Sequence, residues 1–181
     1  MSVALCREDA IVLGRCAGGR GPMLRSDELG WLYDLAEQAP DGIAVEIGIF
    51  CGGSLVCWAA ARQGRGPIIG VDLKLRGGLL QTVEQTGYDI QLVTGDSWEA
   101  HKEIPGDLAF CFIDADHSIE GVTKDILPWT SRVMPGGIVV FHDYDVWKPT
   151  VAVQEYVDYW QSLVQWEDLG AVRSAKAFRR P

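Results

Sequence analysis

Two acidic, histidine-bearing segments stand out in this 181-residue sequence. FIDADHS contains Asp114 and His117, and VVFHDYD contains His142 and Asp143. Each follows an apolar run typical of a buried parallel strand, and neighbouring strands lie about 4.8 Å apart. Asp114 and Asp143 can therefore share one cation. Carboxylates with open water positions favour Mg²⁺, or Mn²⁺ where an imidazole lies nearby.

We expect His117 to act as a general base, because an imidazole titrates near neutrality and can take a proton from a metal-acidified hydroxyl. The competing interpretation is that it caps a helix beginning at Ser118 and that the aspartates are solvated. Two roles stay open for His142. It is a metal ligand, or it orients Asp143 from the end of the strand.

A glycine-rich turn, VEIGIFCGGS, joins an expected strand over 43–47 to a helix. Gly48 lets the chain turn sharply, and Gly52 and Gly53 let the backbone approach a ligand at the helix N-terminus. The spacing G-x-x-x-G-G differs from the G-x-G-x-x-G of dinucleotide enzymes. Glu46 at the strand end suits an amine-bearing cofactor better than a pyrophosphate. A plain tight turn is the alternative.

Polar residues also end the next two expected strands. Asp72 can accept hydrogen bonds from both ribose hydroxyls of an adenosine. Asp96, Ser97 and Trp98 place polar groups beside an aromatic ring, a combination that can hold an adenine. Ordinary loop chemistry explains each residue alone, but their order at successive strand ends favours a nucleoside-bearing cofactor.

The elements that must position these residues alternate between strand and helix. A helix beginning at Ser26 precedes them, Pro149 opens a late helix, and the tail predicts a two-stranded hairpin. The alternation predicts an α/β fold, a doubly wound and mostly parallel sheet. We expect one domain over 1–181, with 1–25 as a flexible segment. The strands are expected at 43–47, 67–73, 89–96, 108–114 and 136–143.

Composition narrows the class of protein. Hydrophobic residues make up 48% and charged residues 23%, as in ordinary globular domains. The net charge of −9 argues against a nucleic-acid partner, which needs a basic face. No apolar run is long enough for a membrane span. Five cysteines match no zinc or redox motif, so we expect a reduced, cytoplasmic protein.

With these residues in hand, the chain resembles the class I S-adenosylmethionine-dependent methyltransferases. More narrowly, it resembles the small metal-dependent O-methyltransferases. These include the catechol and caffeoyl-coenzyme A enzymes and the bacterial antibiotic and sugar O-methyltransferases related to cephalosporin-hydroxylase-type proteins. VEIGIFCGGS carries the resemblance at the cofactor loop. FIDADHSIEGVTKDI followed by PGGIVVFHDYD carries it for the bacterial subgroup.

The resemblance implies a Rossmann-like seven-stranded sheet with an antiparallel last strand, S-adenosylmethionine as cofactor and a small-molecule hydroxyl as methyl acceptor. Asp114 and Asp143 match metal ligands, with Asp114 also beside the cofactor, and His117 matches the base. Met23 falls where relatives bring a loop over the cofactor. The implied cofactor contacts are Glu46, Gly48, Phe50 and Ser54 at the methionine part, Asp72 at the ribose, and Asp96, Ser97 and Trp98 at the adenine.

Two departures from the family pattern leave alternatives open. Tyr144 stands where many metal-dependent members have Asn or Asp, which favours a metal-independent methyltransferase acting on another atom such as nitrogen. The N-terminal part is short, so the substrate pocket is open or completed by a second copy, and a non-catalytic cofactor-binding subunit is a further alternative. Aromatic residues including Trp147 could line the pocket. The glycine spacing disfavours a nicotinamide dehydrogenase.

Overall fold

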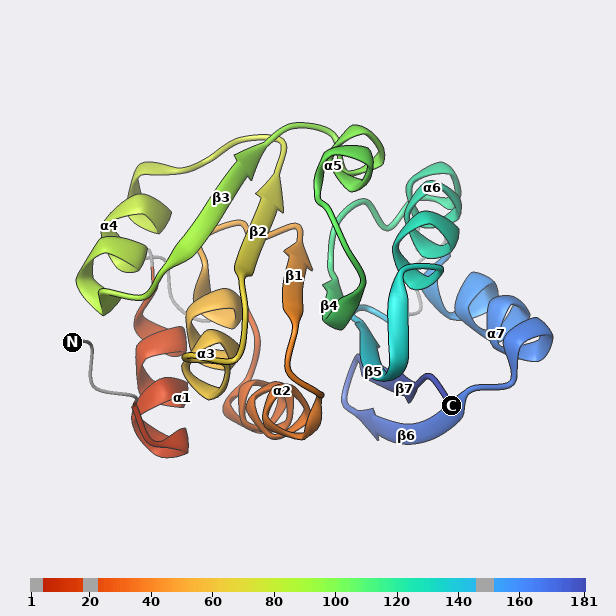
Figure 1. The fold of residues 1–181 in the computed structure, drawn as a ribbon, viewed down its shortest axis with the longest axis horizontal. Coiled ribbons are helices and arrows are strands. Elements are labelled where there is room, and N and C mark those ends of the chain that lie inside the picture. Colours follow the sequence, from red (N-terminus) through yellow and green to blue (C-terminus); the bar gives the residue numbers. More distant parts are fainter. Residues whose placement is uncertain (1–4, 18–22, 146–151) are drawn as a thin grey trace.

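The structure is a computed structural model that describes residues 5–17, 23–145 and 152–181. Its strands form one seven-stranded sheet in the order β3-β2-β1-β4-β5-β7-β6 (Figure 1). The strands are β1 (Ile43–Ile47), β2 (Ile68–Asp72), β3 (Ile90–Thr94), β4 (Leu108–Ile113), β5 (Val133–Phe141), β6 (Glu167–Val172) and β7 (Ala175–Arg179). The helices are α1 (Arg7–Cys16), α2 (Ser26–Gln38), α3 (Gly53–Ala61), α4 (Gly77–Thr86), α5 (Ser97–Glu103), α6 (Ile119–Thr130) and α7 (Val153–Val164).

The pairing directions confirm the predicted fold class. The β1–β2, β1–β4, β2–β3 and β4–β5 pairs are parallel, whereas β7 pairs antiparallel with both β5 and β6. The tail therefore forms the expected hairpin, whose last strand inserts beside β5. The result is the Rossmann-like, mostly parallel sheet with an antiparallel last strand.

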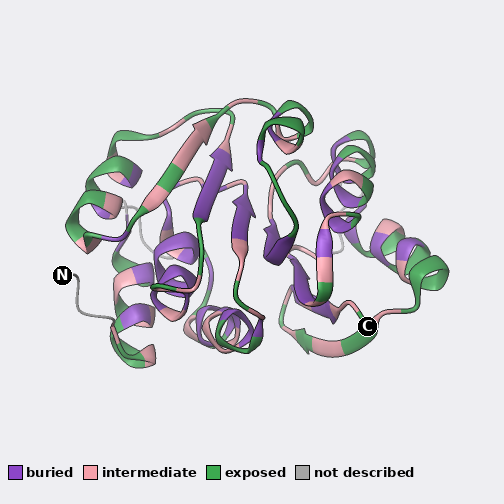
Figure 2. Ribbon diagram, viewed as in Figure 1, coloured by how far each residue is buried: buried purple, intermediate pink, exposed green. Residues whose placement is uncertain are grey.

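Helices cover both faces of the sheet, so its central strands are buried (Figure 2). Phe110 and Phe112 of β4 face the core that contains residues of α1, α2, α3 and α4. Cys111 and Ile113 face the opposite core, with residues of α5, α6 and α7. This two-sided burial explains why the β4 sequence is apolar without alternation.

One sequence prediction is wrong in this part of the fold, and one helix was missed. Residues 1–25 were expected to form a flexible segment, but Arg7–Cys16 form a helix packed on α3. The packing is close, since a Cβ on Gly14 would lie 2.5 Å from the carbonyl oxygen of Gly53. The glycines in this segment led to the prediction of a loop, but in the structure Gly14 permits close packing of the helix. The helix α5 was also not expected.

The topology brings the ends of β1 to β5 to one edge of the sheet, where the candidate residues lie. The predicted helix start at Pro149 and the aromatic Trp147 lie outside the described residues. Among the helices that the structure describes, none has the length and apolar character that a membrane crossing requires.

Candidate active site

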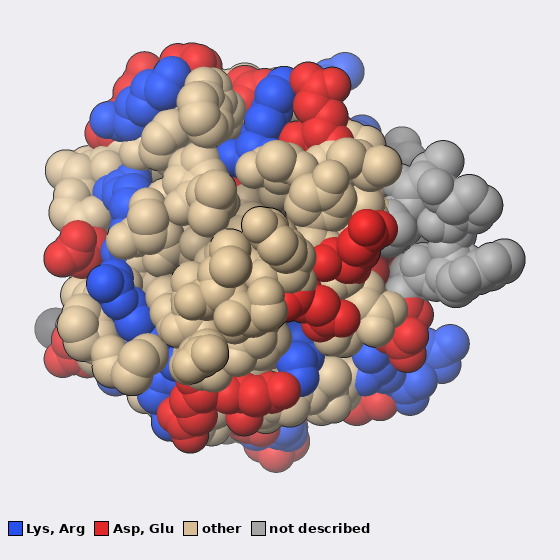
Figure 3. Space-filling model, turned by 90° about the vertical axis from the view of Figure 1, so that its right-hand side faces the viewer, with Lys and Arg blue, Asp and Glu red and all other residues tan. Residues whose placement is uncertain are grey.

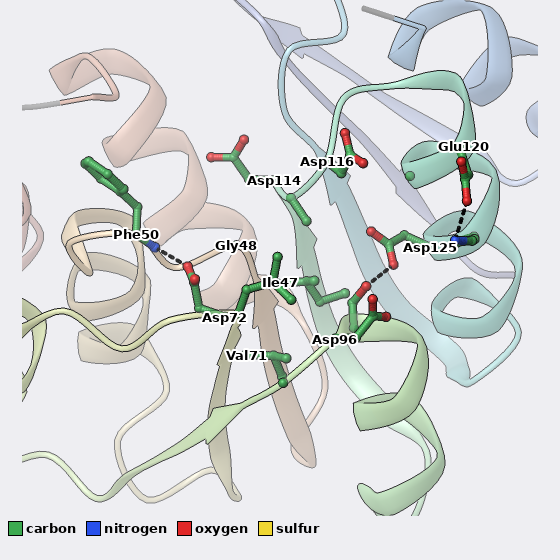
Figure 4. A pocket seen from close by; sticks show the side chains of 16 residues that line it. Ile47, Gly48, Phe50, Val71, Asp72, Asp96, Asp114, Asp116, Glu120 and Asp125 are labelled. Carbon is green, nitrogen blue, oxygen red and sulfur yellow. Dashed lines mark hydrogen bonds and ion pairs between the residues drawn. The ribbon is translucent and has the colours of Figure 1, made fainter.

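A cavity of about 510 Å³ opens at the carboxyl ends of the parallel strands (Figure 4). Its size is in the range of small-molecule and cofactor sites. Six of the residues predicted from the sequence to bind a cofactor line it: Gly48, Phe50, Asp72, Asp96, Ser97 and Asp114.

Gly48 forms the wall where β1 ends. Its φ of +87° is in the left-handed region, and a Cβ there would overlap the carbonyl oxygen of Asp114. The Gly48 N–H donates to the Val71 carbonyl, and the Asp114 N–H donates to the Ile47 carbonyl. Only glycine permits this crossing of the β1 end over the β4 end.

Asp72 is fixed at the end of β2 by two backbone groups. The Phe50 N–H donates to Oδ2 at 2.8 Å and the Lys74 N–H donates to Oδ1 at 2.9 Å. Phe50 reaches this position with a φ of +46°, an uncommon conformation for a non-glycine residue. A carboxylate has about four lone-pair sites, so Asp72 keeps acceptor capacity for a pair of hydroxyls.

The far end of the cavity is formed where α5 and α6 meet. Asp96 caps α5 by accepting the Trp98 N–H at 2.8 Å, and the Ser97 hydroxyl donates to Asp125 of α6. Trp98 is not a lining residue, because its ring stacks 5.2 Å from that of His101 on the same helix. Its contact with the adenine stays a prediction. Sequence reasoning assigned no role to Asp125, although it lies inside the quoted segment FIDADHSIEGVTKDI.

Glu46 is also turned away from the cavity. Its carboxylate is fully buried and accepts hydrogen bonds from Ser54 Oγ at 2.6 Å and Trp58 Nε1 at 2.5 Å. It therefore ties β1 to α3 and is not among the residues that line the cavity. The contact with the methionine part of a cofactor that the resemblance implies for Glu46 stays a prediction. Gly52 likewise faces α4, where a Cβ would lie 2.5 Å from Leu79.

Burial raises the pKa of Glu46 from 4.5 to about 8, although the bonds from Ser54 and Trp58 oppose the rise. The native state thus favours the protonated acid, and the free energy of unfolding should fall as pH rises from about 4.5 to about 8. We expect Glu46→Gln, which stays neutral, to flatten this fall. Denaturant unfolding at a series of pH values measures it, and a slope unchanged from wild type would contradict it.

A smaller cavity of about 40 Å³ adjoins the first and shares Gly48, Phe50 and Asp114 with it. Met23 lines this smaller cavity while remaining 73% exposed, and Ser54 lines it from α3. The helix α1 contributes Gly14 and was missed, because the sequence was read as flexible there.

Asp114 also belongs to a cluster of two carboxylates and one imidazole, formed with His117 and Asp143. His117 Nε2 is 3.2 Å from Asp114 Oδ1, and its Nδ1 is 3.0 Å from Asp143 Oδ2. One ligand atom from each of these three residues lies within 4.8 Å of the others, close enough to hold one ion. The hydrogen bond with Asp114 raises the pKa of His117, while burial opposes it.

His142 is held differently. Its Nδ1 lies 3.2 Å from Asp114 Oδ1, and its Nε2 faces Glu28 and Ser174 at 3.4 Å and 3.2 Å. Burial lowers its pKa, but the carboxylates of Asp114 and Glu28 outweigh burial and raise it to about 10. His142 is absent from the group that could hold an ion, where His117 stands instead. Of its two open roles, this geometry favours orientation of a carboxylate over ligation. The nearer carboxylate is that of Asp114, since Oδ1 of Asp143, the residue that the sequence predicts His142 to orient, lies 3.6 Å from Nδ1.

The family follows from a comparison with known protein families. The model described as a methyltransferase domain matches residues 45–144, more than half of the chain. The chain belongs to this methyltransferase domain family. The matched segment includes the glycine turn and residues that line the cavity, and it ends at Tyr144. The match confirms the sequence-based prediction of a methyltransferase.

Solved methyltransferases share this fold. SAH-bound PaMTH1 of Podospora anserina matches with a TM-score of 0.73 and 16% identity, over 96% of this chain and 88% of that one. An O-methyltransferase of Bacillus cereus in complex with SAH matches with a TM-score of 0.70 and 16% identity, over 96% and 90%. TomG of Streptomyces achromogenes, an O-methyltransferase of tomaymycin synthesis in complex with SAM, matches with a TM-score of 0.69 and 16% identity, over 97% and 89%.

Proposed function

We propose that this methyltransferase moves the methyl group of S-adenosylmethionine to a hydroxyl oxygen of a small molecule, assisted by a divalent cation. One observation carries the proposal. Asp114 borders the large cavity and also belongs to the carboxylate–imidazole cluster. A cofactor in the cavity and a hydroxyl at the cluster would therefore meet at one residue.

The cavity suits an adenosine-bearing cofactor. Asp72 offers a fixed carboxylate for the ribose, and Gly48 lets the methionine part approach the backbone. Asp96 and Ser97 stand at the adenine end. The printed descriptions of TomG, PaMTH1 and the B. cereus enzyme name SAM or SAH as their bound ligand, which supports the same class here.

The cluster suits a divalent cation because two carboxylates can coordinate it, with the imidazole of His117 next to them. A cation bound there would acidify a hydroxyl, as metal ions do for bound water. Tyr144 does not join the donors, because its hydroxyl donates to Asp158 at 2.5 Å. The proposed ligands are the two carboxylates of the cluster, Asp114 and Asp143.

His117 is the proposed base. Its side chain is 33% exposed, whereas that of His142 is 12% exposed, so only His117 presents substantial surface to an acceptor. The sulfonium methyl carbon is already activated, and the protein mainly aligns the acceptor oxygen and removes its proton. Without a cation, Asp114 favours the protonated imidazole. A bound cation would neutralise the carboxylates, so the imidazole of His117 would become neutral and could accept a proton.

A small molecule suits the charge of the protein. On the face that Figure 3 shows, lysine and arginine side chains are scattered among acidic ones and form no continuous basic surface over the described residues. Several acidic side chains also line the cavity itself.

The organisation as a single domain over 1–181 and the pairing of two copies stay predictions.

A calorimetric titration with S-adenosylhomocysteine tests the proposal, once with Mg²⁺ or Mn²⁺ and once with a chelator. We expect micromolar binding in both conditions and separate binding of the cation. Cofactor binding without cation binding would favour the metal-independent alternative, which Tyr144 motivates. Absence of cofactor binding in both conditions would exclude a cofactor-binding subunit as well and favour a degenerate subunit of a larger assembly.

A further inference from the structure

Glu28 lies on α2, outside the residues 45–144 that match the methyltransferase domain. Its side chain is only 5% exposed. Oε1 accepts the Ser174 hydroxyl at 2.9 Å and lies 3.4 Å from His142 Nε2. Oε2 accepts the Arg25 N–H at 2.9 Å, which closes the N-terminal turn of α2. The carboxylate thus connects a helix end with the imidazole at the end of β5.

His142 is held on both of its nitrogen atoms. Ser174, in the turn between β6 and β7, lies 3.2 Å from Nε2 on the side of Glu28. Nδ1 lies 3.2 Å from Asp114 Oδ1 on the other side. The Phe112 ring meets the imidazole edge-on at a centroid distance of 6.1 Å. The chain of contacts therefore runs from α2 through the imidazole of His142, which is 12% exposed, to the carboxylate at the cavity.

We propose that Glu28 is a positioning residue that acts on Asp114 through His142. Glu28 and Ser174 fix the imidazole so that its Nδ1 meets Asp114 Oδ1, which sets the direction of that carboxylate. This role rests on the proposed function, in which Asp114 holds a cation next to the cofactor. Parts of the chain outside the matched domain then complete the site.

Asp114 needs such support because the terminal torsion of an aspartate is broad and does not fix its two oxygens. Hydrogen-bonded partners behind a ligand hold it in the geometry that binds the ion, and their removal typically costs about 10- to 100-fold in metal affinity or activity. His142 provides that bond, and Glu28 is the group that fixes the other side of the ring.

Glu28→Gln is the variant of choice, because glutamine can still accept the Arg25 N–H and complete the helix cap. The substitution replaces one of the two acceptor oxygens of Glu28 with an NH₂ group, which cannot accept a hydrogen bond. Glu37→Gln makes the same chemical change at an exposed position of the same helix and serves as the matched control. Equal melting temperatures of the two variants would show that both fold.

The experiment titrates each protein with Mn²⁺, following free Mn²⁺ by electron paramagnetic resonance, and then with S-adenosylhomocysteine. We expect Glu28→Gln to weaken Mn²⁺ binding about 10- to 100-fold and to change S-adenosylhomocysteine binding less than twofold. Glu37→Gln should match wild type in both. Unchanged Mn²⁺ affinity in Glu28→Gln would overturn the proposal.

Two further readouts separate positioning from a general charge effect. In a His142→Asn background, Glu28→Gln should have no further effect on Mn²⁺ affinity, whereas a long-range charge effect would persist and overturn the proposal. The second readout is the hydrogen-bonded imidazole N–H signal of His142 in ¹⁵N-histidine spectra. It should shift in Glu28→Gln, because a carboxylate near Nε2 is replaced by a neutral amide, and stay at its wild-type position in Glu37→Gln. If wild type binds no Mn²⁺, the proposed cation fails, and this signal alone decides: a wild-type position in Glu28→Gln overturns the proposal and a shift supports it.

Discussion

His117→Ala should lose most methyl transfer while keeping its affinity for S-adenosylhomocysteine. General-base catalysis contributes about 10²- to 10⁴-fold, so a loss of turnover in that range is expected. The cofactor affinity should persist because His117 does not line the 510 Å³ cavity. The measurement is the rate of S-adenosylhomocysteine formation with a hydroxyl acceptor that the wild-type protein methylates.

The same variant separates a base from a metal ligand, since His117 lies between Asp114 and Asp143. A base should leave Mn²⁺ affinity nearly unchanged, whereas loss of a ligand should weaken it. His101→Ala is the matched control, because that histidine packs against Trp98 on α5 and lines none of the cavities described above. Turnover at the wild-type level in His117→Ala would remove His117 from the mechanism.

The parallel core of the fold was predictable from the sequence because its signals are local. The unbroken apolar run of β4 reflects burial on both faces. Polar residues stand at or just beyond the ends of β2, β3, β4 and β5, at the edge where the site forms. The sharp turn at Gly48 was predicted correctly. Its positive φ and the nearby Asp114 carbonyl leave no room for a side chain. Each of these features depends on a few neighbouring residues.

The helices α1 and α5 were not predictable in the same way. Gly14 permits contact with Gly53, 39 positions further along the chain, and the sequence does not record that contact. The direction of a side chain is a tertiary property as well. Glu46 turns to Ser54 and Trp58, and Trp98 turns to its own helix, although both stand next to residues that line the cavity.

The histidines show how partners from distant segments decide a role. His117 and His142 have similar neighbours in the sequence, with aspartate close to each. The structure adds Glu28 and Ser174 to the surroundings of His142 alone, and both lie outside the two motifs. In our proposal these partners distinguish His142, which would orient a carboxylate, from the more exposed His117, which would meet a substrate.

Asp72→Ala should weaken the binding of S-adenosylhomocysteine by more than tenfold, which corresponds to about 1.4 kcal/mol or more for lost charge-assisted hydrogen bonds. Two effects combine in this variant. The ribose hydroxyls would lose their acceptor, and the backbone N–H groups of Phe50 and Lys74 would lose the carboxylate that fixes them. Calorimetry measures the affinity, and Asp89→Ala, an exposed aspartate beside β3, is the control.

Asp72→Asn separates these two effects, because the amide oxygen can still accept one of the two backbone N–H groups while the charge is lost. If the ribose contact dominates, Asp72→Asn should lose nearly as much affinity as Asp72→Ala, since a neutral amide bonds hydroxyls more weakly than a carboxylate does. If the order of the Phe50 turn dominates, Asp72→Asn should lie close to wild type. Wild-type affinity in both variants would exclude Asp72 from the cofactor site and leave the cavity without its proposed ribose anchor.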